Sequence, residues 1–144
     1  MNQSERDIFT LARTIWGEAR GELHGGRVAV ANVIINRFKK RGWWAQAKND
    51  RIEDNTIEAV CRAPWQFSCW NKDDPNLPYM LALTEDDKTF MECLNIARDA
   101  ETMALPDITF RSKHYHNLTV SPKWAEDKTP IIQVGNHLFF NNVE

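Results

Sequence analysis

The chain has 144 residues, 42% hydrophobic and 26% charged, which excludes wholesale disorder and predicts one globular domain covering residues 1–144. Eighteen lysines and arginines nearly balance 20 aspartates and glutamates, and the net charge of −2 argues against nucleic-acid binding through a basic surface. The one unusual number is six tryptophans against two tyrosines.

Four helices are predicted before residue 105. The first covers about residues 4–21, with Ser4 as its N-terminal cap and apolar residues at helical spacing on one face. The second covers about residues 27–40 and is apolar around much of its circumference, which is typical of a central helix. A short third helix follows its cap, Thr56, to about Arg62, and a fourth covers about residues 84–104.

After Pro106 the periodicity changes to that of short strands, which are predicted at residues 108–110, 114–116, 131–134 and 138–140. The Gly135-Asn136 pair predicts a tight turn between the last two. Helices followed by a small antiparallel sheet in the C-terminal third indicate an α+β fold that is mainly helical.

The N-terminal segment is polar and then amphipathic, without the apolar run of a secretory signal or a membrane anchor. We therefore expect synthesis in the cytoplasm, no insertion into a membrane, and a monomer. Three cysteines cannot form a closed set of disulfides. The spacing allows a bridge between Cys61 and Cys69, but reduced, partly buried thiols are favoured.

Two glutamates near the end of the first helix are candidates for acid–base chemistry. Glu18 follows Trp16 closely, and a carboxyl beside apolar aromatic surface has a raised pKa that suits a general acid. Glu22 would lie on the same side of the helix if the helix continued that far, and glycoside cleavage commonly uses two carboxyls. The alternative is a solvated helix end in which both glutamates pair with neighbouring arginines.

A second candidate is the Gln66-Phe67-Ser68 loop, which lies between Trp65 and Trp70. Aromatic faces stack on the C–H surfaces of sugars, while amide and hydroxyl groups hold the sugar hydroxyl and acetamide groups. The alternative is a packed loop whose tryptophans close the core.

Three histidines raise the question of a metal. His114 and His116 would face the same side of a strand, and with His137 they could bind Zn²⁺ and leave one position open. Glu18 would then be the general base of a zinc hydrolase. Histidines bonded to backbone or carboxylate groups are the alternative, and no H-E-x-x-H motif is present.

In their order along the chain, these motifs resemble the SleB-type cell-wall hydrolase family of spore-cortex lytic enzymes and their bacterial and phage relatives. The specific part is E-A-R-G-E at residues 18–22, followed by V-A-V-A-N-V-I-I-N-R at residues 28–37. The resemblance spans about residues 11–140 and continues at shorter motifs: Gln66-Phe67-Ser68, His114-Tyr115-His116, Pro122-x-Trp124-Ala125 and Gly135-Asn136-His137-x-Phe139-Phe140.

The resemblance implies a lysozyme-like catalytic domain that binds peptidoglycan glycan strands and cleaves the bond between N-acetylmuramic acid and N-acetylglucosamine without a metal or other cofactor. By motif position Glu18 matches the catalytic acid, and one carboxyl suffices for a lytic transglycosylase because the muramic acid C6 hydroxyl attacks the anomeric carbon. The implied substrate-binding residues are Glu22, Gln66, Phe67, Ser68, Trp70, Tyr115, His116, Trp124, Asn136 and His137. The expected context is phage-type lysis, with action on the wall after release. A zinc-dependent amidase or peptidase and a glycan-binding module are the alternatives.

Two features stand apart from these motifs. Relatives usually carry glycines before the His-Tyr-His stretch, where residues 106–113 of this chain read P-D-I-T-F-R-S-K, so the cleft wall is expected to differ. The Trp43-Trp44 pair lies away from every candidate motif and is interpreted as a packing element after the second helix.

Overall fold

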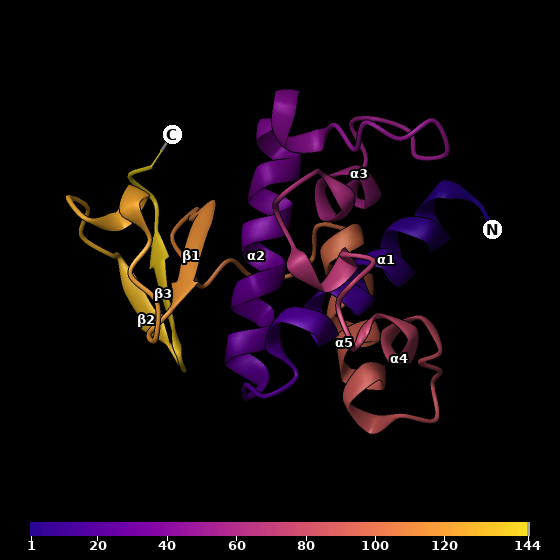
Figure 1. Cartoon of the computed structure of the whole chain (residues 1–144). Helices are drawn as coiled ribbons and strands as arrows, with labels where there is room; N and C mark the ends of the chain where they lie inside the picture. Colours follow the sequence, from indigo (N-terminus) through magenta and orange to yellow (C-terminus); the bar gives the residue numbers. More distant parts are fainter. Residues whose placement is uncertain (144) are drawn as a thin grey trace.

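The computed structural model describes residues 1–143, as a helical body with a small sheet on one side of it (Figure 1). The α-helices are α1 (Gln3–Ala19), α2 (His24–Lys40), α3 (Ile57–Arg62), α4 (Leu77–Leu81) and α5 (Lys88–Glu101). Short 3-10 segments are η1 (Gly42–Ala45), η2 (Ser68–Trp70) and η3 (Lys123–Ala125). The strands are β1 (His114–Asn117), β2 (Ile132–Val134) and β3 (His137–Phe140). The predicted α+β fold is confirmed.

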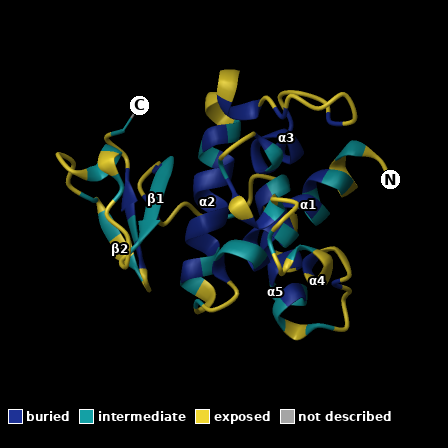
Figure 2. Cartoon of the chain, viewed as in Figure 1, coloured by how far each residue is buried: buried dark blue, intermediate teal, exposed yellow. Residues whose placement is uncertain are grey.

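Helix α2 lies at the centre, as its all-round apolar pattern predicts. It is buried along most of its length, whereas exposed residues gather in the connecting loops (Figure 2). Helices α1, α3 and α5 pack together with α2 to form the main core. Leu11, Ile15 and Ile34 have no exposed surface, and burying each such side chain contributes about 1.5–3 kcal/mol. Among residues 1–143, no helix is long and apolar enough to cross a membrane.

The helix boundaries differ from the predicted ones at the caps. Asn2, not Ser4, caps α1, because its side chain accepts a hydrogen bond from the Glu5 backbone N–H at 2.9 Å. Asp87, not Thr84, caps α5 by accepting from the Phe90 N–H, so this helix begins later than predicted. In both helices, a side-chain acceptor close to the predicted cap makes the capping hydrogen bond instead, so the predicted cap residue was wrong.

Three further details concern the helical body. Helix α2 begins at His24, three residues before the predicted start, and the α3 bounds agree with the prediction. Helix α4 was missed inside a turn-rich stretch, although Pro78 in its first turn is compatible with a helix start. The cysteines Cys61, Cys69 and Cys93 are all free and buried, as favoured over a disulfide.

The sheet has the strand order β1-β3-β2, and both pairings are antiparallel. Strands β2 and β3 form the predicted hairpin, with Gly135 at a φ of +56°, a backbone conformation that favours glycine. One face of the sheet packs against α2, where Tyr115 and Phe139 lie near Ala29 and Val33. The sheet is therefore mounted directly on the central helix.

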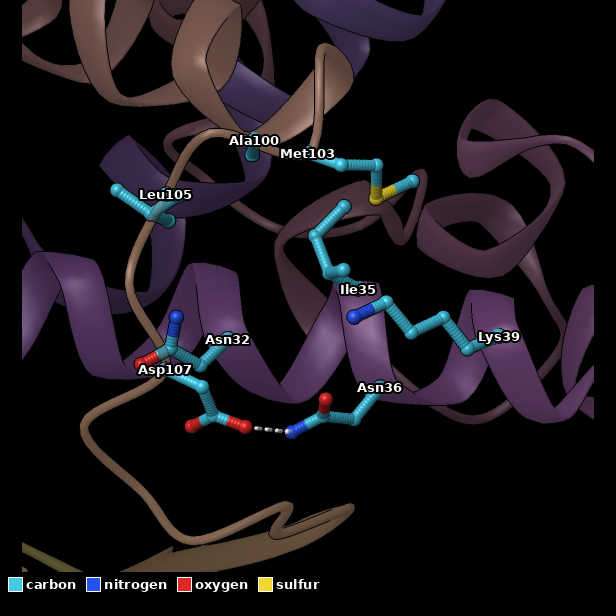
Figure 3. A pocket seen from close by; sticks show the side chains of 8 residues that line it. All are labelled: Asn32, Ile35, Asn36, Lys39, Ala100, Met103, Leu105 and Asp107. Atoms are coloured by element: carbon cyan, nitrogen blue, oxygen red, sulfur yellow. Dashed lines mark hydrogen bonds between the residues drawn. The ribbon is translucent and has the colours of Figure 1, made fainter.

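The strand predicted at residues 108–110 does not form. Instead, this segment is an irregular connection that α2 holds in place: Asn32 bonds the Pro106 carbonyl and the Ile108 N–H. Asn36 points toward Asp107, and its amide donates to that carboxylate at 3.0 Å (Figure 3). Because side chains of α2 satisfy these backbone groups, the segment needs no strand partner.

Candidate active site

Glu18 lies in the last turn of α1, where the helical body meets the sheet. The hydroxyl of Tyr115, on β1, donates a hydrogen bond of 2.6 Å to Glu18 Oε1. Two residues that are 97 positions apart in the chain therefore meet at one carboxyl. Of the predicted site residues, Tyr115 is the one that contacts Glu18 most directly.

Burial raises the pKa of Glu18 above its usual value, because the ionised form loses hydration. Hydrogen bonding from Tyr115 and Cys69 and the positive charge of Arg37 act in the opposite direction but do not cancel the effect. Asp74 adds a further upward influence. A carboxyl with this balance keeps its proton to higher pH than an exposed glutamate, as a general acid requires.

Arg37 was not among the predicted site residues, although it ends the V-A-V-A-N-V-I-I-N-R motif. Its Nε donates to the Lys113 carbonyl at 2.8 Å, and one terminal nitrogen donates to Gln66 Oε1 at 3.3 Å. The guanidinium also lies over the Trp44 ring, 4.4 Å from its centroid. Burial lowers the Arg37 pKa to about 10, and the nearby Glu18 and Tyr115 oppose that shift. Arg37 is thus a buried cation that joins the Gln66 loop, β1 and the Glu18 site.

A small recess of about 60 Å³ opens beside Glu18. Its lining residues come from the end of α1, η2, the segment before α4 and α4 itself, and they are Trp16, Gly17, Glu18, Arg20, Ser68, Cys69, Asp74, Asn76 and Met80. A Cβ on Gly17 would lie 2.6 Å from Cys69 Cβ, so only glycine lets η2 come this close to the acid. The exposed ring of Tyr79 stacks on Trp16 at 6.2 Å and extends an aromatic surface from this recess.

The Gln66–Trp70 segment divides between the site and the core. Ser68 is exposed and lines the recess, and Gln66 reaches the site through Arg37. Phe67 is buried beneath the Arg37 guanidinium and belongs to the main core. Trp70 packs against that core and donates its ring N–H to Thr14 at 3.0 Å, which indicates a structural role.

Glu22 lies outside the helix that carries Glu18, because α1 ends at Ala19. Its two carboxylate oxygens accept hydrogen bonds from the backbone N–H and side-chain amide of Asn136, at 2.8 and 2.9 Å. Burial pushes the Glu22 pKa upward, but these hydrogen bonds and the nearby His137 outweigh it, so the pKa is lowered. The Glu22 carboxylate therefore fastens the β2–β3 turn to the connection between α1 and α2.

The close packing around the Glu22 side chain explains why two neighbouring positions are glycines. A Cβ on Gly26 would lie 2.7 Å from Glu22 Cβ, and one on Gly135 would lie 2.2 Å from Glu22 Oε1. Both glycines leave room for the same carboxylate side chain. Asn136, predicted to bind substrate, serves Glu22 in this arrangement.

The three histidines do not gather around one point. His137 pairs with Asn117 in the register and contacts the Tyr115 ring, so it lies on the face of the sheet that meets α2. His114 and His116 lie on the opposite face, where both rings contact Trp124. Because the sheet separates them, the zinc ligand set considered as an alternative does not form. Within residues 1–143, no group of three or more acidic, histidine or cysteine side chains could hold a metal ion.

His116 and Trp124 form part of an aromatic cluster on the outer face of the sheet. The His116 ring stacks on Phe140 with centroids 5.3 Å apart, and its Nδ1 lies 2.8 Å from the Asn117 carbonyl. Trp124 meets Phe140 edge-on at 5.1 Å. These contacts brace the sheet, and the cluster lies on the face away from Tyr115 and Glu18.

A family model described as Cell Wall Hydrolase matches residues 21–140. Spore cortex-lytic enzymes of Oceanobacillus iheyensis and Bacillus subtilis are 29% and 28% identical over 139 residues, 94% of this chain. Those residues are 42% and 38% of the two proteins, so the chain spans about two fifths of the length of these curated relatives.

Two solved structures share the fold. The catalytic domain of Bacillus cereus SleB is 27% identical, with a TM-score of 0.66 over 96% of this chain and 91% of that one. The catalytic domain of the germination-specific lytic transglycosylase SleB from Bacillus anthracis is 26% identical, with a TM-score of 0.62 over 94% and 93%.

Proposed function

The chain belongs to the cell wall hydrolase family, and from this premise we propose that it degrades peptidoglycan as a lytic transglycosylase. The bond cleaved is the β-1,4 linkage between N-acetylmuramic acid and N-acetylglucosamine, and Glu18 is the general acid and base. The observation that carries the proposal is a carboxyl whose pKa burial raises and which Tyr115 holds at 2.6 Å. The name of the Bacillus anthracis relative supports the same reaction type.

One carboxyl completes the reaction. Protonated Glu18 gives its proton to the glycosidic oxygen, and the bond between that oxygen and the muramic acid anomeric carbon breaks. The C6 hydroxyl of the same muramic acid then attacks the anomeric carbon and returns a proton to the Glu18 carboxylate. The products are an N-acetylglucosamine end with a free 4-hydroxyl and a 1,6-anhydromuramic end, and no water is consumed.

The neighbours of Glu18 suit both halves of this cycle. The Tyr115 hydroxyl donates to Glu18 Oε1 and limits the rotation of the carboxyl, so the carboxyl is pre-organised for proton transfer. The Arg37 charge favours the carboxylate that exists between the two proton transfers. Ser68 and the stacked Trp16–Tyr79 surface lie where a sugar in the recess would contact them.

Mass analysis of peptidoglycan digested by the chain tests the reaction type. We expect fragments ending in 1,6-anhydromuramic acid from the wild type and none from Glu18→Gln with unchanged helical circular dichroism. Reducing muramic ends would instead identify a hydrolase that uses water, and free stem peptides would identify an amidase. Either product pattern contradicts the transglycosylase proposal.

A further inference from the structure

Outside the Glu18 site, a hollow that the proposed function does not use lies at the C-terminal end of α2. Its volume is about 460 Å³, within the range of small-molecule sites. The lining residues come from α2, η1, the segment before β1 and the C-terminal segment, and they are Lys40, Trp43, Trp44, Lys113, Asn141, Asn142 and Val143. We call this feature the Trp43 hollow.

The two tryptophans of this hollow have different surroundings. Trp44 is 3% exposed, with the Arg37 guanidinium over its ring and the His114 ring edge-on at 5.3 Å. Trp43 stacks on Trp44 with centroids 3.8 Å apart, yet it is 57% exposed. Packing accounts for Trp44 but leaves an outward-facing Trp43 ring on a rigid support. Such a ring loses little conformational freedom when a ligand stacks on it.

Among residues 1–143, the charged side chains that line the hollow are positive. Lys40 and Lys113 line the hollow, and neither forms an ion pair with a carboxylate of residues 1–143. Asn141 and Asn142 add amide groups, each held by a hydrogen bond to a backbone carbonyl, at 3.0 and 3.2 Å. The hollow therefore offers an aromatic face, two cations and oriented amides, in a chain whose net charge is −2.

From this chemistry we infer that the Trp43 hollow is a second, non-catalytic binding site for the acidic arms of peptidoglycan. A sugar ring stacks on Trp43, and a carboxylate of the stem peptide attached to a muramic acid lies between Lys40 and Lys113. The inference rests on the proposed function for its choice of polymer. Because one wall polymer carries many such units, a second weak site increases retention on the wall without changing the chemistry at Glu18.

Co-sedimentation with intact cell-wall sacculi tests the inference, with Glu18→Gln as the common background. We expect Trp43→Ala to raise the apparent dissociation constant roughly tenfold, less than the ~10²–10⁴-fold gain that linked sites can give, because the second site is weak. Met103→Ala, a matched control at a 47% exposed apolar side chain, should stay within about twofold. Trp43→Phe keeps an aromatic face and should retain most of the affinity, which separates loss of the ring from any loss of folding.

Substitution of the two lysines tests whether the Trp43 hollow binds the acidic stem peptides of peptidoglycan or only neutral sugar. The double variant Lys40→Gln/Lys113→Gln should weaken retention several-fold at low salt, and the difference should shrink as salt screens the charges. Insoluble chitin has N-acetylglucosamine but no peptide arms, and its retention should not respond to the lysine change. Lys128→Gln, at another exposed lysine, is the charge control.

Unchanged retention in Trp43→Ala, or in the double lysine variant, would overturn the inference. Equal loss on chitin and on sacculi after the lysine change would also overturn it. The readout is bound protein, so it is separate from the proposed function. A wild-type chain that binds sacculi through Trp43 yet releases no glycan fragments would contradict only the proposed function.

Discussion

Glu18 and Glu22 are the same residue type, four positions apart, yet their surroundings drive their pKa values in opposite directions. Glu18 is partly buried at the end of a helix, with the Tyr115 hydroxyl donating to Oε1, and its pKa is raised. Glu22 accepts two hydrogen bonds from Asn136, and its pKa is lowered. The comparison teaches that the balance between desolvation and stabilising hydrogen bonds and charges, rather than position in a motif, decides the direction of each pKa: desolvation prevails at Glu18, and the contacts from Asn136 and His137 prevail at Glu22.

The largest expected effect is the loss of activity in Glu18→Gln, by at least about 10³-fold, because the amide cannot supply the proton that we assign to the Glu18 carboxyl. The release of soluble fragments from purified cell walls measures this loss. Substantial remaining activity would assign the acid to another residue and remove the distinction between the two glutamates.

The same variant has a predicted effect on stability. The folded state raises the Glu18 pKa, so the stability of the wild type is fully present at low pH and falls as pH rises through that pKa. Glu18→Gln removes this fall, so its Tm should exceed that of the wild type by a margin that grows with pH. Thermal unfolding at several pH values checks the trend, and a margin constant with pH would contradict it.

Tyr115→Phe should have the next largest effect on activity. Loss of the hydroxyl removes a hydrogen bond that lowers the Glu18 pKa, so that pKa should rise further. We expect activity to fall about tenfold, as the carboxyl loses orientation, and the alkaline limb of the pH–rate profile to move to higher pH. A lower rate with an unmoved limb would indicate that Tyr115 only shapes the sheet.

Glu22→Gln should instead act mainly on stability. A glutamine can accept from only one Asn136 donor and places its own N–H₂ against the other, so the free energy of unfolding should drop by about 1–3 kcal/mol. Because the lowered pKa of Glu22 stabilises the fold at neutral pH and this gain is lost in acid, the difference from wild type should shrink as pH falls toward that pKa. Denaturant unfolding at pH 7 and pH 4 measures both. Activity lost as completely as in Glu18→Gln would support a two-carboxylate mechanism.

The smallest predicted effect concerns the connection that brings Tyr115 to Glu18. Arg111 has a φ of +64°, which is strained for a residue with a Cβ. Arg111→Gly should raise the free energy of unfolding by less than about 1 kcal/mol, since glycine also gains freedom in the unfolded chain. A clear decrease in chemical denaturation would mean that the Arg111 side chain contributes more than its backbone strain costs.

Much of this arrangement follows from the sequence. The all-round apolar pattern of residues 27–40 predicts a central helix, and Gly135-Asn136 predicts the hairpin, and both are found. Glu18 was singled out from its aromatic and motif context. Its burial in the structure agrees with that interpretation, and its catalytic role stays a prediction.

The helix-cap errors are local, but three other features that the sequence did not show have one physical cause, which is contact between residues far apart in the chain. Residues 108–110 have strand-like composition, but Asn32 and Asn36 on α2 satisfy the backbone of the surrounding segment. Arg37 was overlooked because its partners, Lys113 and Gln66, are 76 and 29 positions away. The place of Glu22 depends on Asn136, 114 positions away, and no local pattern encodes that pairing.

These contacts between residues far apart in the chain also determine when the proposed catalytic site forms during folding. The contact between Glu18 and Tyr115 and the clamp between Glu22 and Asn136 each join the beginning of the chain to its last third. Contacts of this separation are slow to form, whereas helices of the body assemble from neighbours. During synthesis Glu18, the proposed acid, therefore emerges from the ribosome long before Tyr115, and the nascent helical body lacks the contact between them. On the proposed mechanism, the site is complete only after β1 has been made and has packed against the helical body.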